Sequence, residues 1–410
     1  MSEPKPALIH DWDDGATPLR AISIQDETLR EGLQSPFVAD PADEVKLELL
    51  HLIERIGIEH VSVGIPAASD RAKTTAIRLC REVVDCSLRV RPNAGGRTVA
   101  SDVHAIIDVA NAVGTAPAAF LFIGSSPIRQ YVEDWDLALL RRRTRDAVGV
   151  ATLAGLEVTY ILEDTTRARP EQLEALLTEA IDAGARHVCL CDTVGCATPA
   201  GTRNLVEWSR ELLDRIAPAT GLDWHGHDDR GLGLANALAA IDAGVDRVHT
   251  TALGLGERAG NTATEQLLVN LRLRGGDRYD MTALPEYVQR VSAATGVPIA
   301  HDAPVVGSDV FRTAAGVHAA AIEKARARGD DDLADRVYCG VPASWLGRAQ
   351  EILIGPLSGA SNARAVLREM GAKEDDEAIR RLLDRAKASR CVLTRSEVAQ
   401  IVAEGEEMTQ

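Results

Sequence analysis

Aromatic side chains are scarce in this chain of 410 residues, in which Phe, Trp and Tyr together make up 3%. Hydrophobic residues as a whole make up 45%, so a sizeable core can still be buried. Ala, Val, Leu and Ile must therefore fill most of that core. The length is too great for one small domain and fits a large barrel with an appended part.

Basic residues are too few to balance the acidic ones. The chain has 45 Lys and Arg against 61 Asp and Glu, which gives a formal net charge of −16. This excess argues against nucleic acid or an anionic membrane surface as the main partner. It does not exclude a small anionic substrate, because a few local arginines can hold one.

The sequence also lacks a long apolar run and a cysteine framework. No run is long enough to cross a bilayer, and the N-terminus shows no signal-peptide pattern, so we expect no membrane partner. The seven cysteines are an odd number without framework spacing, and Cys189 and Cys191 do not form a CxxC pair. We expect seven reduced thiols in a cytoplasmic protein.

Short β-rich runs alternate with segments of helical periodicity, such as 44–57 and 232–245, between residues 20 and 275. Eight such β-then-α units predict an α/β fold, a closed (β/α)₈ TIM barrel. An open doubly wound sheet is the alternative, but a Gly-rich turn usually follows its first strand, and here the charged "ETLREGLQSP" follows. The expected strands are 21–26, 60–64, 88–92, 118–124, 156–162, 187–192, 223–227 and 246–254.

The pattern changes after the barrel, which we expect to occupy residues 1–275. We expect an α-rich appendage at 276–410, with a charged, irregular segment at 328–342. The expected helices are 281–296, the end of 301–322, 360–371, 374–388 and 395–404.

Two histidines two residues apart, His225 and His227, end the seventh expected strand. Side chains alternate along a strand, so both imidazoles point into one mouth of the barrel, where TIM-barrel active sites form. With a carboxylate from the first strand end, either Glu31 or Asp26, they suit one divalent cation with open positions for a substrate. The alternative is that one histidine is a hydrogen-bonded barrel residue. Arg30 is either a cation aimed at a substrate oxygen or part of a structural ion pair.

Five motifs make the chain recognisable: "DETLREGLQSP", "EDTTR", "DTVG", "HGHDDRGLGLANALAAIDAGVDRV" and "GLGERAGNTATEQ". Together, over about 20–360, they resemble the DRE-TIM metallolyase superfamily. Its condensing members are 2-isopropylmalate, homocitrate and citramalate synthases, and its cleaving members include hydroxymethylglutaryl-CoA lyase. The appendage, and a loop "GLGERAGN" without cysteine, favour the condensing branch.

The resemblance implies roles for individual residues. Arg30 matches the catalytic arginine, and Glu31 matches the carboxylate ligand, which is Asp in most members and Glu in homocitrate synthases. His225 and His227 match the metal histidines, and Asn261 matches an asparagine near the metal.

Further matches concern the substrate. Thr193 matches a threonine that contacts the oxoacid carboxylate, and Glu163 an acidic residue that helps order the site. Gln34 and Asp26 are further expected substrate contacts.

The appendage resembles the part of the synthases that reaches over the partner subunit's barrel. His318 and Tyr338 are therefore acid/base candidates in a homodimer whose sites are completed in trans.

The implied reaction joins acetyl-CoA to a 2-oxoacid on a divalent metal (Mg²⁺, Mn²⁺ or Zn²⁺) and gives a 2-hydroxy-2-(carboxymethyl) acid. The alternatives are a cleaving lyase or aldolase, an Fe(II) oxygenase and a non-catalytic barrel. The identity of the oxoacid stays open. Arg129 stands where homocitrate synthases bind a distal carboxylate, or is a surface arginine, whereas Ile161 makes the wall more apolar. This mixture predicts a non-standard 2-oxoacid.

Overall fold

The computed structural model describes residues 8, 10, 12 and 20–407. The N-terminal segment, where no signal peptide was expected, lies mostly outside these residues. The chain divides into two compact units, Met1–Tyr279 and Asp280–Gln410. The division falls a few residues beyond the predicted boundary at 275/276.

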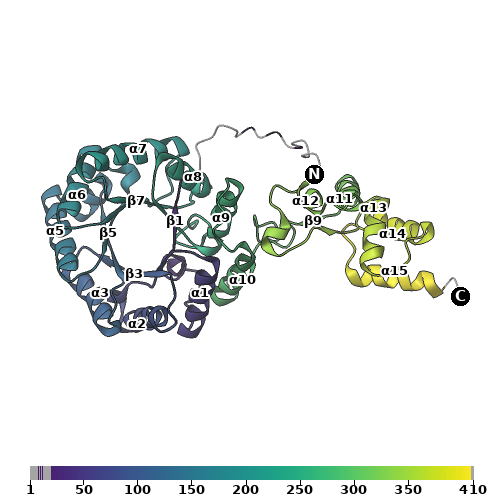
Figure 1. Ribbon diagram of the computed structural model, residues 1–410, viewed down its shortest axis with the longest axis horizontal. Coiled ribbons are helices and arrows are strands. Elements are labelled where there is room, and N and C mark those ends of the chain that lie inside the picture. Colours follow the sequence, from purple (N-terminus) through teal and green to yellow (C-terminus); the bar gives the residue numbers. More distant parts are fainter. Residues whose placement is uncertain (1–7, 9, 11, 13–19, 408–410) are drawn as a thin grey trace, which may run out of the picture. The chain divides into compact units, whose positions relative to one another are not determined.

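The first unit is a closed barrel of eight parallel strands, each paired with its neighbours in chain order, with β8 returning to β1 (Figure 1). The predicted TIM barrel is confirmed. The strands are β1 Ser23–Asp26, β2 His60–Ser62, β3 Arg91–Arg97, β4 Ala118–Gly124, β5 Val158–Glu163, β6 His187–Asp192, β7 Gly221–Gly226 and β8 Arg247–Thr250.

Most of the helices that surround the barrel bury an apolar face. In α1, for example, Leu49, Leu50 and Ile53 are buried at helical spacing, and the helix ends at Gly57, whose φ of 91° suits glycine. The helices are α1 Asp43–Ile56, α2 Asp70–Asp85, α3 Ala100–Val113, α4 Pro127–Glu133, α5 Leu137–Leu153, α6 Pro170–Asp182, α7 Pro199–Ile216, α8 Gly233–Ala243 and α9 Thr264–Leu273.

Strand β3 lies further along the chain than predicted, at Arg91–Arg97 instead of 88–92. Its proline and two glycines are typical of a loop, so the strand was expected to end at residue 92. The backbone nevertheless pairs with β4 from Asn93 to Arg97. A Cβ on Gly96 would lie 3.2 Å from Asp102 and Ile106, so the close packing of α3 favours glycine there.

Charged side chains fill part of the barrel interior. Nε of Arg247 donates to Oδ2 of Asp223 at 2.8 Å, and Nε2 of His249 lies 3.4 Å from the same oxygen. All three residues are buried. Burial alone would raise the pKa of Asp223, but Arg247 and the neighbouring histidines hold it well below its usual range. The carboxylate therefore stays ionised and places a buried negative charge below the barrel mouth.

The second unit contains mainly helices around small apolar clusters, as expected. One segment differs from the prediction, because α12 lies within the region expected to be irregular. Asp330 caps its first turn through Leu333 N, and Ala334 is buried beside Ile322, which explains the helix. The elements are α10 Leu284–Thr295, β9 Arg312–Thr313, α11 Gly316–Ala327, α12 Asp331–Arg336, β10 Glu351–Ile352, α13 Ala360–Glu369, α14 Asp376–Ala388 and α15 Arg395–Glu407.

Within the described part of the chain, no helix is both long enough and apolar enough to cross a membrane. All seven cysteines lie within the described residues, and each is a free thiol.

Candidate active site

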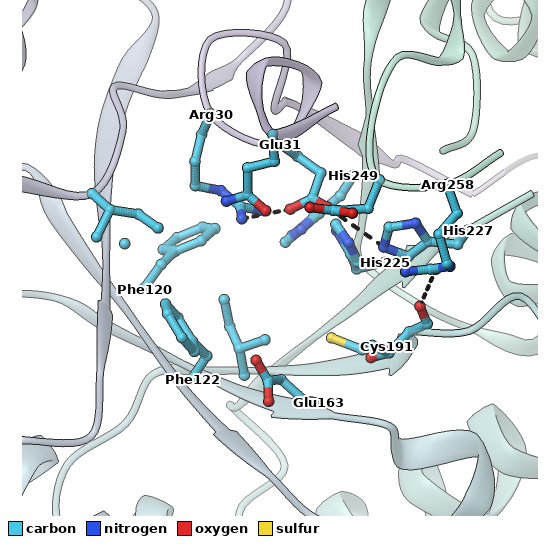
Figure 2. Close-up of a pocket in the computed structure, with 16 residues that line it drawn as sticks. Arg30, Glu31, Phe120, Phe122, Glu163, Cys191, His225, His227, His249 and Arg258 are labelled. Carbon is cyan, nitrogen blue, oxygen red and sulfur yellow. Dashed lines mark hydrogen bonds and ion pairs between the residues drawn. The ribbon is translucent and has the colours of Figure 1, made fainter. Parts of the chain in front are cut away.

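A cavity of about 200 Å³ opens at the carboxyl ends of the barrel strands (Figure 2). All eight strands contribute to its lining, β1 and β2 through the loops that follow them and β3 to β8 through residues of the strands themselves. Sequence reasoning had assigned eight of these residues to the site or its wall: Arg30, Glu31, Gln34, Ile161, Glu163, Thr193, His225 and His227.

Glu31, His225 and His227 converge on one point of this cavity. One ligand atom of each lies within 4.8 Å of the other two, and all three residues are buried. Oε1 of Glu31 is 3.6 Å from Nε2 of His227, and the two imidazole centroids are 5.3 Å apart. Of the two carboxylates considered from sequence, Glu31 is the one beside the histidines.

The protonation states of this group suit a cation. Burial lowers the pKa of His225 well below its ordinary value, and the nearby rings of His227 and His249 add to the shift. Burial also lowers the pKa of His227, although Glu31 opposes it. Neutral imidazoles carry the lone pair that a metal needs. Two imidazole nitrogens and one carboxylate therefore form a donor set that fits Zn²⁺, Mn²⁺ or Mg²⁺.

Asn261 joins this group from the loop after β8. Its Nδ2 lies 3.4 Å from Nε2 of His225, and its backbone bridges to His227. Its buried Oδ1 has no hydrogen-bond partner among the described residues. A Cβ on Gly256 would lie 2.0 Å from that oxygen, so a glycine is needed where Asn261 approaches.

Arg30 is held between two carboxylates. Its Nε donates to Oε2 of Glu27 and its Nη1 to Oε2 of Glu31, both at 2.6 Å. Burial would lower the arginine's pKa, but the two carboxylates raise it, so the guanidinium stays charged. Arg30 thus forms structural ion pairs and also faces the cavity (Figure 2).

Glu27 was not singled out from sequence, although it is fully buried beneath the site. Its Oε1 lies 3.6 Å from Nδ1 of His249, whose other nitrogen approaches Asp223. A series of contacts therefore links Asp223 in the barrel interior to Arg30 at the mouth, through His249 and Glu27. Its position directly before the motif "TLREG" was the sequence signal that could have identified Glu27 as a site residue.

Glu163 and Thr193 lie at the ends of neighbouring strands. Burial raises the pKa of Glu163; Arg129 opposes this shift, and Glu31 and Asp164 reinforce it. Oγ1 of Thr193 accepts a hydrogen bond from Asp164 N at 2.8 Å. Its hydroxyl hydrogen therefore remains available to a ligand.

Two expected substrate residues are not part of the cavity lining. Asp26 is buried, and its Oδ1 accepts from Thr28 N at 2.8 Å, which shapes the loop that carries Arg30. Arg129 forms an ion pair with Glu133 at 2.9 Å, and its guanidinium lies 5.6 Å from the ring centroid of Trp135.

His318 and Tyr338 belong to the second unit. Their rings stack with centroids 3.9 Å apart and planes inclined by 24°. Oγ1 of Thr313 lies 3.5 Å from Nδ1 of His318. The side chains of the two acid/base candidates are therefore in contact with each other. Their acid/base roles stay predictions.

Several lining residues were missed from sequence. Alternation along "AAFLFIG" could have placed Phe120 and Phe122 on one face of β4, and the same rule on β8 points to His249. Gly95 was missed because the predicted third strand ended at residue 92, before this glycine. The missed lining residues are Ile65, Gly95, Phe120, Phe122, Cys191, His249, Glu257 and Arg258.

Relatives with known names share most of the chain. Homocitrate synthase AksA of Methanopyrus kandleri is 30% identical over 93% of this chain and 91% of its own length. A 2-isopropylmalate synthase of Sulfolobus acidocaldarius is 30% identical over 90% of this chain and 91% of its own length. Both names belong to the condensing branch that the motifs predicted.

Solved structures agree on the fold. The HMG-CoA lyase of Bacillus subtilis superposes with a TM-score of 0.58 at 21% identity, over 69% of this chain and 97% of the lyase. The HMGL-like family matches residues 21–291, the part that contains the barrel and the converging ligands. The chain belongs to the HMGL-like family, as its motifs predicted.

Proposed function

We propose that this barrel catalyses a divalent-metal-dependent condensation of acetyl-CoA with a 2-oxoacid, which releases CoA and a 2-hydroxy-2-(carboxymethyl) acid. The convergence of Glu31, His225 and His227 beside the charged Arg30 carries the proposal. The names of the relatives, homocitrate synthase and 2-isopropylmalate synthase, support it.

Glu31, His225 and His227 would hold the divalent cation, with Asn261 beside them. A cation bound there supplies a Lewis acid that polarises the ketone of the oxoacid. The donor set accepts Mg²⁺, Mn²⁺ or Zn²⁺, so the choice of metal is a matter for measurement.

The chain's own groups orient the oxoacid and stabilise the charge that develops. Thr193 donates its free hydroxyl hydrogen to the oxoacid carboxylate. Arg30, held rigidly by Glu27 and Glu31, presents a cation to the oxygen that gains negative charge, and such preorganised charge lowers the barrier. Gln34 lies on the same rim and can donate its amide hydrogens to the oxoacid.

Carbon–carbon bond formation requires a base for the acetyl-CoA methyl group. The proton leaves the methyl carbon, the resulting enolate attacks the ketone carbon, and the ketone oxygen takes up a proton. Water then cleaves the thioester and CoA leaves as the thiol. We assign the acid/base work to the stacked pair His318 and Tyr338, and we assign Glu163 to ordering the site.

The proposal further describes a cytoplasmic homodimer in which each second unit completes the barrel site of its partner. A mixture of two inactive variants, Arg30→Ala and His318→Ala, tests this arrangement. Shared sites would restore about a quarter of wild-type activity to the mixture, because about half of the dimers would be mixed and each mixed dimer would have one intact site. Light scattering would first show that the mixed protein is dimeric. No recovery of activity in that protein after subunit exchange would contradict the arrangement.

The reaction is tested by thiol release from acetyl-CoA with a panel of 2-oxoacids, using protein stripped with EDTA and reloaded with Mn²⁺. We expect metal-dependent CoA release and a product heavier than the oxoacid by an acetic acid unit. His227→Asn should abolish both. Cleavage of a hydroxyacyl-CoA without any CoA release would instead identify a lyase.

A further inference from the structure

The cavity wall away from the metal ligands is apolar and aromatic. Phe122 and Ile161 line it together with Ile65 and Phe120. Figure 2 shows the two phenylalanine rings side by side, across the cavity from His227. The chain has only four phenylalanines, so two of the four at one small cavity mark this wall as distinctive.

The two phenylalanines contribute differently. Phe120 is 2% exposed and stacks on His249 with centroids 5.7 Å apart, so it mainly packs the barrel core. Phe122 is less deeply buried and lies one alternation nearer the mouth on β4. It is therefore the ring that a ligand's side chain would meet.

No arginine of the lining is left for a second carboxylate. Arg30 is paired with Glu27 and Glu31. Arg258 donates to Oδ1 of Asp229 at 2.8 Å and to the backbone oxygen of Thr193. A distal carboxylate would lose its water without gaining a cation.

Acidic groups make the cavity still less suitable for a second anion. Glu163 and Glu257 line it in addition to Glu31. Arg129, the cation expected from sequence, is paired with Glu133 and is not among the lining residues. Charge and burial therefore both favour an uncharged side chain.

Space for a bulky group comes from Gly95 on β3. A Cβ there would lie 3.3 Å from Cγ1 of Ile65 and 3.5 Å from Cδ of Arg30. The missing side chain thus leaves open the part of the cavity beside Ile65. A larger residue at this position would occupy the volume next to the apolar wall.

We propose that the 2-oxoacid of the proposed condensation, on which this inference rests, carries a bulky uncharged side chain, with an aromatic ring as the best fit. The ring packs against Phe122 between Ile65 and Ile161, in the space left by Gly95. Aromatic side chains pack well against one another in offset or edge-to-face contacts.

The test measures kcat/KM by CoA release with phenylpyruvate, 4-methyl-2-oxopentanoate, pyruvate and 2-oxoglutarate, each with acetyl-CoA and Mn²⁺. We expect phenylpyruvate to exceed 2-oxoglutarate by about 100-fold or more, because a buried unpaired charge is strongly disfavoured. A preference for 2-oxoglutarate would overturn the proposal.

Two substitutions probe the wall itself. Phe122→Ala and Gly95→Val should each lower kcat/KM for phenylpyruvate about 10-fold or more, with a change for pyruvate of about twofold at most. Phe37→Ala is the matched control, since Phe37 is exposed and outside the lining, and it should leave the ratio of the two substrates unchanged. Equal losses for both substrates in Phe122→Ala and Gly95→Val would contradict the assignment.

Failure of the reaction can be separated from failure of this inference. If no oxoacid releases CoA, the proposed condensation is wrong, and calorimetric titration of the Mn²⁺-loaded protein still ranks the ligands. Tighter binding of phenylpyruvate than of 2-oxoglutarate would support the apolar pocket. Tighter binding of 2-oxoglutarate, or binding of neither, would overturn it.

Discussion

Nε of Arg30 lies 2.6 Å from Oε2 of Glu27, a carboxylate that is buried beneath the cavity. The second carboxylate at Arg30, Glu31, belongs to the candidate metal group. Glu27 is not part of that group, and its carboxylate oxygens approach Arg30 and His249. This division makes it possible to change the orientation of the arginine without removing a metal ligand.

Glu27→Gln should lower kcat about 10- to 100-fold, because a neutral amide replaces one of the two carboxylates that orient Arg30. Steady-state kinetics would measure this loss, and calorimetry should show Mn²⁺ affinity within about threefold of wild type. The exposed Glu171→Gln is the matched control and should change neither quantity. A parallel loss of metal affinity would show that Glu27 supports the metal group instead.

Replacing a metal ligand should, unlike Glu27→Gln, lower the affinity for Mn²⁺ itself. His227→Asn should weaken Mn²⁺ binding about 100-fold or more, because one of three protein ligands is lost. Titration calorimetry measures it, with the exposed His104→Asn as control.

A second group, in which His51 and Cys86 are exposed and Glu82 is half-buried, also has its potential ligand atoms within 4.8 Å of one another. The titrations are therefore repeated in a His51→Ala background. Loss of tight binding through His51→Ala alone would contradict the assignment of the metal to the barrel mouth.

Much of the barrel could be predicted because its signals are local. Runs such as 118–124 and 187–192 match β4 and β6 at both ends. β3 could not be placed, because its proline and glycines suit a loop, and only pairing with β2 and β4 holds them in a strand. Such pairing depends on residues far away in the sequence.

The same contrast between local signals and contacts of distant residues applies to the site. His225, His227 and Glu31 could be named because strand alternation and a motif point to them. The i,i+4 pairing of Arg129 with Glu133 was missed because α4 was not predicted, although Ser126 and Pro127 are a local signal for the start of this helix. Glu27 was missed because its partner His249 comes from a strand more than 200 residues later.

Glu265 offers a test of the loop that carries Asn261. Its Oε2 accepts from Leu253 N at 3.0 Å, where Leu253 has a φ of 58°. Burial raises the pKa of Glu265 from 4.5 to about 7. A carboxyl whose pKa is raised by folding stabilises the protein below its unfolded pKa, and this contribution disappears as pH rises through the folded pKa.

The free energy of unfolding of wild type should therefore fall relative to that of Glu265→Gln as pH rises from about 4.5 to 8. A shift of this size corresponds to about 3 kcal/mol at most. Urea unfolding of both proteins at several pH values measures the difference. A difference that stays constant over this range would show that the carboxyl has no raised pKa.

Arg129→Ala separates the two interpretations of that arginine. Because Arg129 pairs with Glu133 and is not part of the lining, its removal should change KM for 2-oxoglutarate and for phenylpyruvate by the same factor, within about twofold. The exposed Arg142→Ala is the matched control for loss of one positive charge nearby. A selective rise of KM for 2-oxoglutarate, about 10-fold or more, would mean that Arg129 turns into the cavity when an acidic oxoacid binds. In that event the distal carboxylate predicted from the motif would have its cation, and the apolar wall would no longer determine the substrate.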